Sequence, residues 1–326
     1  MKKSAALDLW LGDIERQQLA RDASRIFSET WRAGPVHRRF EQAFAPDRML
    51  DAQAAATTVE ALFGDDAWVA SLIDGLAQEL RREPFFAPPF PNFSSDVHRG
   101  LAVFGNAFVS VAAGVTHATQ LAAKKHGPRG ATSIGFTGRP MVLKFVKAGD
   151  ARISLWEADP ITEDFAAEPG QSCRRAGERV LSDGDILVID GRCQSYVIEH
   201  ARSNMVILQA EILAGTAPLS VEYDSATLAY VGCSATDDGA SRIQMMTTLL
   251  RKLGHDEAFD AVAVFLDHPD FFVRWHVMRE LLGIDAGRAL PLLRRMTADD
   301  PHPDARHAAI SVLPRLEAAL VRQEAA

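Results

Sequence analysis

The stretch GDILVIDGRCQSYVIEH, residues 184–200, decides how the middle of this chain folds. A β-branched run over 186–189 leads into a tight Asp190-Gly191 turn, and a second β-rich run follows the turn. Asp-Gly between two such runs is typical of a tight turn. The stretch therefore predicts two strands joined by that turn.

Similar runs extend outward from these two strands, from about Leu101 to Cys233. Turn residues such as Gly149-Asp150 and Asp183-Gly184 separate them, and one helical segment at 117–127 interrupts them. Many short strands with little helix between them predict an antiparallel sandwich or barrel (jelly roll). The runs are AFVSVAAG, TSIGF, MVLKFVKAG, ARISLWEA, DILVID, CQSYVIEH, NMVILQAEIL, LSVEYD and TLAYVGC.

The regions on either side of the strands are helical, so the predicted fold class is α+β. In the first region Leu7, Trp10, Leu11 and Ile14 recur at spacings of three and four, as on one face of a helix. Gly34-Pro35 predicts the end of that helical run. Further helices are expected at about 47–63 and 66–82, with aspartates as N-caps.

Between these helices and the strands lies EPFFAPPFPNFSSD, residues 83–96. Its four prolines exclude a helix, and its four phenylalanines predict contact with a folded surface. We expect an extended strap whose aromatic rings pack against a domain. A proline-rich recognition peptide is the alternative.

The C-terminal region contains an internal repeat. His-Pro-Asp triplets begin at His268 and His302, 34 residues apart, and each precedes an apolar helix that contains an arginine. Asp270 with Arg274, and Asp304 with Arg306, follow the turns. This unit of helix, Pro-Asp turn and helix resembles HEAT repeats, in which the apolar faces of successive helix pairs stack. The resemblance implies a surface for binding partner proteins.

The β region resembles the cupin superfamily. The segments FVKAGDARISLW and VLSDGDILVIDGRCQSYVI are similar to the two cupin motifs, a strand-glycine-strand hairpin and a Gly-Asp turn leading to a Pro-x-Gly-x-x-His turn. Gly184-Asp185 fits the second motif. Ile189-Asp190-Gly191 occupies its Pro-x-Gly positions without the proline. The resemblance implies a double-stranded β-helix, a barrel that in many cupins holds a metal.

The resemblance also implies that the usual ligand positions are empty. Gln194 occupies the position of the metal-binding histidine. If Gly149 is the hairpin glycine of the first motif, its glutamate position falls near Val142 and its two histidine positions within 133–138, SIGFTG. A catalytic metal needs three or four converging donors. We therefore expect a cupin-like barrel without metal or other cofactor.

Other donors keep a metalloenzyme open as the alternative. His98, His117, Gln194 and His200 lie in or near the β region and could bind Fe, Mn or Zn if three of them met at one point. Such a protein would be a cupin-type oxygenase or isomerase acting on a small molecule.

A small ligand could also bind a barrel interior without a metal. Lys144 shares its strand parity with Val142 and Val146, so it points inward if they do, and an inward cation needs a partner or an anionic ligand. Alternatively, the polar residues face water, since strand register is not fixed by one sequence. The candidate ligand-binding residues are Lys144, Arg152, Trp156, Arg192, Gln194, Tyr196 and Gln209.

Composition limits the partners. The net charge of −8 argues against a nucleic acid, because phosphate binding needs clustered cations. A nucleic-acid-binding surface would require a basic stripe on the C-terminal helices. Its residues would be Arg251, Lys252, Arg288, Arg294 and Arg295.

Nothing in the sequence predicts a membrane or secreted protein. No apolar run approaches the roughly 20 residues of a membrane span, and the start lacks the apolar core of a signal peptide. The three cysteines, Cys173, Cys193 and Cys233, are far apart and show no CxxC spacing. We expect a cytoplasmic protein with reduced thiols.

Four segments are predicted: helices at 1–82, the strap at 83–100, the cupin-like barrel at 101–235 and HEAT-like helices at 236–326. The predicted function is a non-catalytic small-ligand-binding, regulatory or scaffold protein. Its helical regions would contact a protein partner or a second copy. Trp275, His276 and Arg279 are a candidate contact surface on the repeat, although a tryptophan at a helix-packing position also fits the core.

Overall fold

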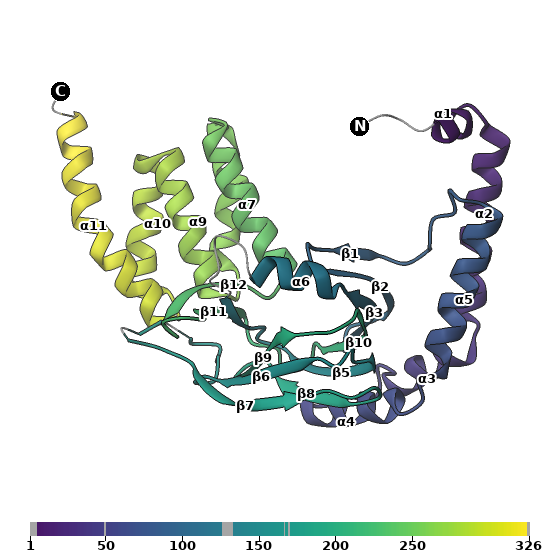
Figure 1. Ribbon diagram of the computed structural model, residues 1–326. Helices are drawn as coiled ribbons and strands as arrows, with labels where there is room; N and C mark the ends of the chain where they lie inside the picture. The colour runs from purple at the N-terminus through teal and green to yellow at the C-terminus, as the bar shows by residue number, and fades with distance from the viewer. Residues whose placement is uncertain (1–4, 49, 126–132, 166, 169, 325–326) are drawn as a thin grey trace. The chain divides into compact units, whose positions relative to one another are not determined.

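The computed structural model describes residues 5–48, 50–125, 133–165, 167–168 and 170–324 (Figure 1). The chain forms two compact units. The first contains Met1–Asp159, Cys173–Thr216 and Asp224–Leu228, and the second contains Pro160–Ser172, Ala217–Tyr223 and Ala229–Ala326. The predicted segment boundaries at 82, 100 and 235 stay predictions.

The first unit begins with helices. Gly12 and Asp13 interrupt the first helical run, and Asp13 caps the second helix by accepting a 2.9 Å hydrogen bond from the Arg16 backbone N–H. The second helix ends at Arg32, just before Gly34-Pro35, as predicted, and Pro35 begins the third helix. The helices are α1 (Ala5–Leu11), α2 (Ile14–Arg32), α3 (Pro35–Ala43), α4 (Ala52–Phe63) and α5 (Ala67–Arg82).

Aspartates cap the next two helices, but not all at the expected positions. Asp51 rather than Asp47 caps α4, by accepting from the Ala54 N–H at 2.8 Å. Asp65 accepts from the Ala67 N–H at the start of α5. The expected helix over 47–63 is therefore shorter at its start.

The Pro/Phe segment packs as a strap. Phe86 and Phe90 are buried, and their rings make edge contacts with Phe27 at 6.0 and 6.2 Å. The Phe90 ring also meets the Trp31 ring edge-on at 5.9 Å. These contacts join the strap to α2 and bear out the prediction of a packed segment.

Antiparallel strands form the rest of the first unit. One sheet has six strands in the order β1-β2-β3-β10-β5-β8, and another has three in the order β7-β6-β9. The strands are β1 (Asn92–Ser94), β2 (His98–Gly105), β3 (Val109–Thr116), β4 (Ser133–Phe136), β5 (Pro140–Lys147), β6 (Arg152–Glu157), β7 (Arg174–Val180), β8 (Ile186–Asp190), β9 (Gln194–His200) and β10 (Met205–Ile212). The expected helical insert is α6 (Ala118–Lys125).

Strand β5 separates two apolar cores. Met141, Leu143 and Phe145 point to one face and pack with residues of β6, β8, β9 and β10. Val142 lies on the other face, in the core that the sheet shares with α4 and α5. Successive residues of a strand point to opposite faces, so the apolar run of β5 contributes side chains to both cores.

The second unit combines a strand pair with helices. Strands β11 (Leu219–Asp224) and β12 (Tyr230–Ala235) pair antiparallel. The helical part contains α7 (Asp238–Lys252), η1 (Asp256–Ala258), α8 (Phe259–Ala263), η2 (Val264–Asp267), α9 (Phe271–Ile284), α10 (Ala286–Asp299) and α11 (Pro303–Glu324). The chain thus has N-terminal helices, antiparallel sheets in the middle and C-terminal helices, as predicted. Across the described residues, no helix has both the length and the apolar character needed to cross a bilayer.

The helical repeat has a register of 32 residues rather than the 34 that the His-Pro-Asp triplets indicate. Helices α9 and α11 begin at Phe271 and Pro303, which is 303 − 271 = 32. Arg274 donates to the carbonyls of His268 and Pro269. Arg306 donates to the carbonyls of Asp300 and Pro301, the residues 32 positions later. Pro269 therefore corresponds to Pro301, and the second His-Pro-Asp triplet lies two residues out of register.

Candidate functional site

The space between the two sheets of the first unit is the first candidate site. Apolar side chains line most of it, and Gln209 and Glu211 lie on the same face of β10 as the apolar Met205 and Ile207. Leu143, Phe145, Ile153 and Met205 are fully buried there. Tyr196, one of the candidate ligand-binding residues, packs against this core, and burial raises the pKa of its hydroxyl to about 12. Cores of this kind are packed about as densely as organic crystals.

The positions that the cupin resemblance assigns to a metal do not fit one. Val142 is buried in the core beneath the N-terminal helices, and Ile134 and Phe136 of the 133–138 segment are buried apolar residues. The Gln194 side-chain oxygen accepts a 3.1 Å hydrogen bond from the Asp190 backbone N–H. Within the part of the chain that the structure describes, no three His, Cys, Asp or Glu side chains are grouped to hold a metal ion.

The alternative donors lie at separate places. His98 at the start of β2 shares a 2.7 Å hydrogen bond with the Thr116 hydroxyl, and His117 is close by. Burial, then Lys124 and His117, lower the pKa of His98. Gln194 and His200 are the first and last residues of β9, about 20 Å apart at strand spacing. The structure therefore brings two of the four together and separates the other two.

The turn after β8 is held by its own residues. The Arg192 guanidinium donates to both oxygens of Asp190, at 2.9 and 2.8 Å, and reaches the Gly215 carbonyl at 3.4 Å. Arg192 also holds the pKa of Asp190 below its usual value. Gly191 is required here, because a Cβ would collide with the Arg139 carbonyl. Arg192 thus stabilises the turn that decides the fold.

Lys144 is buried, but on the face of β5 that packs against helices. Its ammonium donates to the carbonyls of Phe63 and Gly64, at 2.6 and 3.4 Å, and lies 3.1 Å from the Asp66 carboxylate. A cation at a helix C-terminus satisfies carbonyls that have no partner within the helix. Lys144 therefore holds the end of α4 against the sheet, and the expected inward cation has a protein partner.

Trp156 belongs to a polar chain on the face of β6 and β9 opposite the apolar core. Its indole N–H donates to the Ser154 hydroxyl at 2.9 Å, and this hydroxyl contacts Glu199 at 2.5 Å. Lys125 of α6 donates to the other Glu199 oxygen at 2.7 Å. Burial works to raise the pKa of Glu199, but the hydrogen bonds from Lys125 and Ser154 outweigh it and keep that pKa low.

Three members of this hydrogen-bonded group were not among the ligand-binding residues predicted from the sequence: Lys125, Ser154 and Glu199. The parity of Ser154 with Trp156 places both on one face of β6, which is a signal that the sequence contains. The contribution of Lys125 depends on where α6 lies, and no sequence pattern gives that. Gln209 makes a similar short contact elsewhere: it donates to Glu211, which Arg139 also binds at 2.9 Å.

Of the candidate ligand-binding residues, Gln194, Tyr196 and Gln209 lie on the strand faces that share the apolar core, and the other four lie elsewhere. Tyr196 faces the apolar core, Lys144 faces the helices, and Arg152 is exposed at the start of β6. Arg192 and Gln194 support a turn, while Trp156 and Gln209 belong to separate polar chains. Pockets for small ligands instead need a few polar groups that converge on one cavity.

In the second unit, buried charges connect successive repeats. Arg274 makes a two-pronged contact with Asp300, at 2.9 and 2.7 Å, and both side chains are buried. Glu280 of α9 accepts from Thr248 of α7 at 2.9 Å and pairs with Arg251. Such contacts set the register of one helix pair on the next.

The outward face of α7 is apolar. Met245, Met246, Leu249 and Leu253 recur at spacings of three and four, and all are exposed. Exposed methionine-rich helix faces suit protein contacts, because the flexible side chain adapts to different partners. Sequence reasoning missed this stripe, since the same pattern predicts a buried face.

The three residues of α9 that the sequence suggests as a contact surface differ in their exposure. Trp275 packs against the helical core, and His276 shares hydrogen bonds with the Gln244 carbonyl and the Thr248 hydroxyl, both at 3.0 Å. Arg279 is exposed. Of the proposed basic stripe, Arg288 and Arg294 are each paired with a carboxylate at 2.7 Å.

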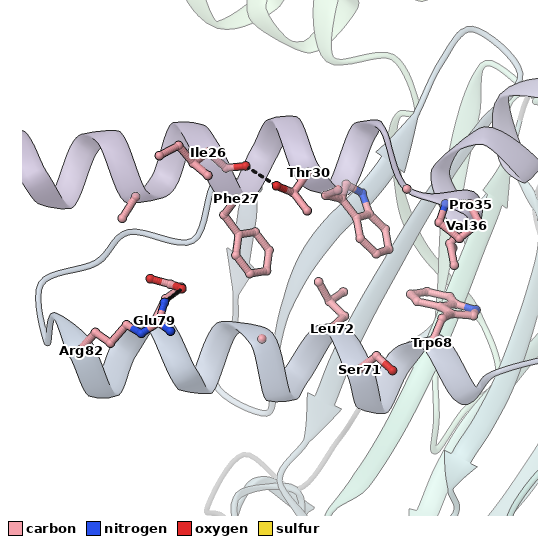
Figure 2. Close-up of a pocket in the computed structure, with 14 residues that line it drawn as sticks. Ile26, Phe27, Thr30, Pro35, Val36, Trp68, Ser71, Leu72, Glu79 and Arg82 are labelled. Atoms are coloured by element: carbon pink, nitrogen blue, oxygen red, sulfur yellow. Dashed lines mark hydrogen bonds and ion pairs between the residues drawn. The ribbon is translucent and has the colours of Figure 1, made fainter.

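A groove of about 710 Å³ lies between α2 and α5 of the first unit (Figure 2). Phe27 from α2 and Leu72 and Trp68 from α5 point toward one another across it, and Trp31 also lines it. Glu79 and Arg82 stand at one end and pair at 2.7 Å. The groove is therefore apolar along most of its length.

A comparison with protein-family models agrees with the HEAT resemblance. Residues 234–314 match the family model of HEAT repeats, which confirms the predicted repeats. No curated protein matches the chain.

Solved structures similar to this chain include cupin proteins. They are ectoine synthase from P. lautus (15% identity, TM-score 0.22, covering 38% of this chain and 71% of that chain), a cupin domain from Bordetella pertussis Tohama I (14%, 0.21, 37% and 97%) and a sugar phosphate isomerase of the cupin superfamily from Silicibacter pomeroyi (10%, 0.23, 44% and 79%). Likeness at this level carries no information on activity. The chain resembles cupins in its β region and matches HEAT repeats in its C-terminal helices.

Proposed function

We propose that this chain is a non-catalytic, cytoplasmic binding or scaffold protein, in which the sheets form a stable body and the helices contact protein partners. The observation that carries this proposal is the apolar filling of the space between the sheets, around Leu143, Phe145 and Ile153. A reactive centre needs polar groups that converge on a substrate. Here the polar groups on the inner face of β10, Gln209 and Glu211, are bound to each other and to Arg139.

The helical surfaces support protein contact. The exposed stripe of Met245, Met246, Leu249 and Leu253 and the groove between α2 and α5 are the apolar surfaces with room for a partner. Monomeric proteins seldom expose contiguous apolar patches of this kind. Small-ligand binding within the β region has less support, because the candidate residues do not converge.

Metal analysis tests the non-catalytic proposal against the cupin-type oxygenase or isomerase. The full chain is purified without chelators, and its Fe, Mn and Zn contents are measured by inductively coupled plasma mass spectrometry. We expect far less than one metal ion per chain, and no increase in melting temperature when each metal is added. One ion per chain that survives gel filtration would overturn the proposal.

A further inference from the structure

The groove between α2 and α5 is open because large side chains hold the two helices apart. The Phe27 ring lies against Gly75, and the Trp31 and Trp68 rings are 5.8 Å apart at their centroids. Trp31 also donates to the Val103 carbonyl at 3.0 Å, which fixes its ring. The groove is thus a built feature of this helix pair, with a floor of rigid aromatic rings.

One wall of the groove carries protruding apolar residues. Leu19, Ala23, Ile26 and Thr30 of α2 follow one another at spacings of four, three and four, the spacing of a helix that packs lengthwise on another helix. Leu19 and Ile26 are both more than half exposed. Ala23 packs on the core beside Phe27 and Trp31, whereas Leu19 and Ile26 of the same row stay exposed.

The other wall borders a recess. Ser71 of α5 lines the groove with a small side chain, whereas Gly75 is covered by the Phe27 ring of the same chain. This contact shows that Ile26, the neighbour of Phe27, lies at about the level of Gly75. α2 therefore presents protruding side chains, and the groove itself is the recess that can receive them at a matching height.

We propose that this groove is the interface with a second copy of the chain, in which α2 of each copy packs on α5 of the other. A twofold axis parallel to the helices preserves heights, so it places Ile26 at the level of the partner's Gly75 and Thr30 near the partner's Ser71. Protruding side chains and a recess on the same surface are what a self-complementary twofold interface requires. The result is a four-helix bundle built from two helix pairs.

Charge supports the same pairing. Glu15, Asp22 and Glu29 border the apolar row of α2 at intervals of seven, and Arg81 and Arg82 end α5. The contact of Arg16 with Glu83 at 2.6 Å shows that α2 begins beside the end of α5. A parallel twofold axis therefore brings Glu15 of one copy to the arginine end of the partner's α5, where opposite charges attract.

The size of the surface is sufficient. Helices of 19 and 16 residues are about 28 and 24 Å long. Two helices of about 10 Å diameter side by side offer a face of about 500 Å² before side-chain relief is counted. That approaches the roughly 800 Å² per partner of a standard interface. Exposed Leu9, Leu11 and Ile14 extend the apolar surface beyond it.

Sedimentation velocity of the full chain over a concentration series tests the proposal. We expect a dimer whose dissociation constant rises at least about 30-fold in Ile26→Arg, as for a central interface residue. Ile310→Arg is the matched control, since Ile26 and Ile310 are 54% and 53% exposed on helices of different units. Circular dichroism checks that both variants stay folded.

A charge exchange tests the orientation. Glu15→Arg should weaken the dimer several-fold, and Arg82→Glu added to it should restore affinity, because the exchanged charges attract again. Loss in Ile26→Arg without this restoration would overturn the α2-on-α5 pairing in favour of α2 on α2.

Other outcomes reject the interface. A wild-type monomer, a dimer unaffected by Ile26→Arg, or a dimer lost in Ile310→Arg would each overturn it. So would a monomer whose native mass spectrum shows a bound apolar molecule, which would make the groove a ligand site. This inference deepens the proposed function and rests on it, yet metal content and oligomeric state are separate measurements, so either can fail alone.

Discussion

The sheets of the first unit and the helices of the second place polar and apolar residues differently. Between the sheets lies a mainly apolar core, and the polar chain of Trp156, Ser154 and Glu199 lies on the opposite face of β6 and β9. The helical unit also has an apolar core, but it buries Arg274 and Asp300 between repeats and exposes Leu249 on α7.

This difference indicates what each unit does. An apolar interior gives stability without specificity, because any well-packed residues of the right volume suffice. Buried ion pairs contribute little net stability, yet they specify how neighbouring helices register. Exposed apolar residues cost solubility and are typical of binding surfaces. The sheets therefore suit a supporting role, and the helices suit recognition.

The largest effect is expected from Arg274→Ala. This change leaves the Asp300 carboxylate buried without its two hydrogen bonds, which costs about 3–5 kcal/mol of unfolding free energy. Urea denaturation gives the free energy, and hydrogen exchange of α9 and α11 shows where stability is lost. Arg306→Ala is the control at the matching repeat position: Arg306 donates only to the carbonyls of Asp300 and Pro301, so we expect about 1–2 kcal/mol.

Acid distinguishes a buried carboxylate from a general packing defect. In the wild type, burial works to raise the pKa of Asp300, but Arg274 holds it below its usual value. The stability that this ion pair contributes is complete above about pH 3.9, the pKa of an aspartate in the unfolded chain. It is lost as the pH falls through the lower pKa that Asp300 has in the folded protein. Without Arg274 burial prevails and the folded pKa is raised, so the variant should gain stability as pH falls from 7 to 5. A deficit that is constant over this range would contradict the assignment.

Leu143→Ala is expected to have the next largest effect, about 2–5 kcal/mol, because it opens a cavity in the interior between the sheets. Leu249→Ala makes the same change on α7, where the side chain is 46% exposed, and should cost no more than about 0.5 kcal/mol. Thermal and urea denaturation measure both. Equal losses would mean that the α7 stripe is covered and would remove the contrast between the units.

The order of elements followed from the sequence because it depends on local patterns. The β-rich run around Leu143 and the Asp190-Gly191 turn predict strands, and Gly34-Pro35 predicts a helix end. The register of the repeat was harder to predict. His302-Pro303 has the same sequence as His268-Pro269, but the residue that corresponds to Pro269 in the structure is Pro301. The contacts of the two arginines, rather than the triplets, define the repeat.

The candidate site was less accessible to the sequence, because it depends on what covers each face of a sheet. Lys144 shares its parity with Val142, as expected, but whether that face meets a ligand or a helix depends on the position of α4. The α7 stripe and the α2 row show the same limit. An apolar helix face has one sequence pattern, whether it is buried or left open for a partner.

Lys144→Met should have the smallest effect, a loss of about 1–2 kcal/mol of unfolding free energy. It tests whether the buried charge of the first unit matters as much for stability as the buried Arg274 of the second. Two consequences oppose each other: methionine removes the cost of burying an ammonium, while the Phe63 carbonyl loses its 2.6 Å hydrogen bond. Asp66, one-third exposed, regains water, whereas Asp300 cannot, so the loss stays below that of Arg274→Ala. Lys147→Met, at an exposed pair with Asp183, is the control and should change the unfolding free energy by less than about 1 kcal/mol. Urea denaturation measures both, with hydrogen exchange at the end of α4 as the local readout. A loss as large as that of Arg274→Ala would show that the sheet unit, too, depends on a buried charge for its register.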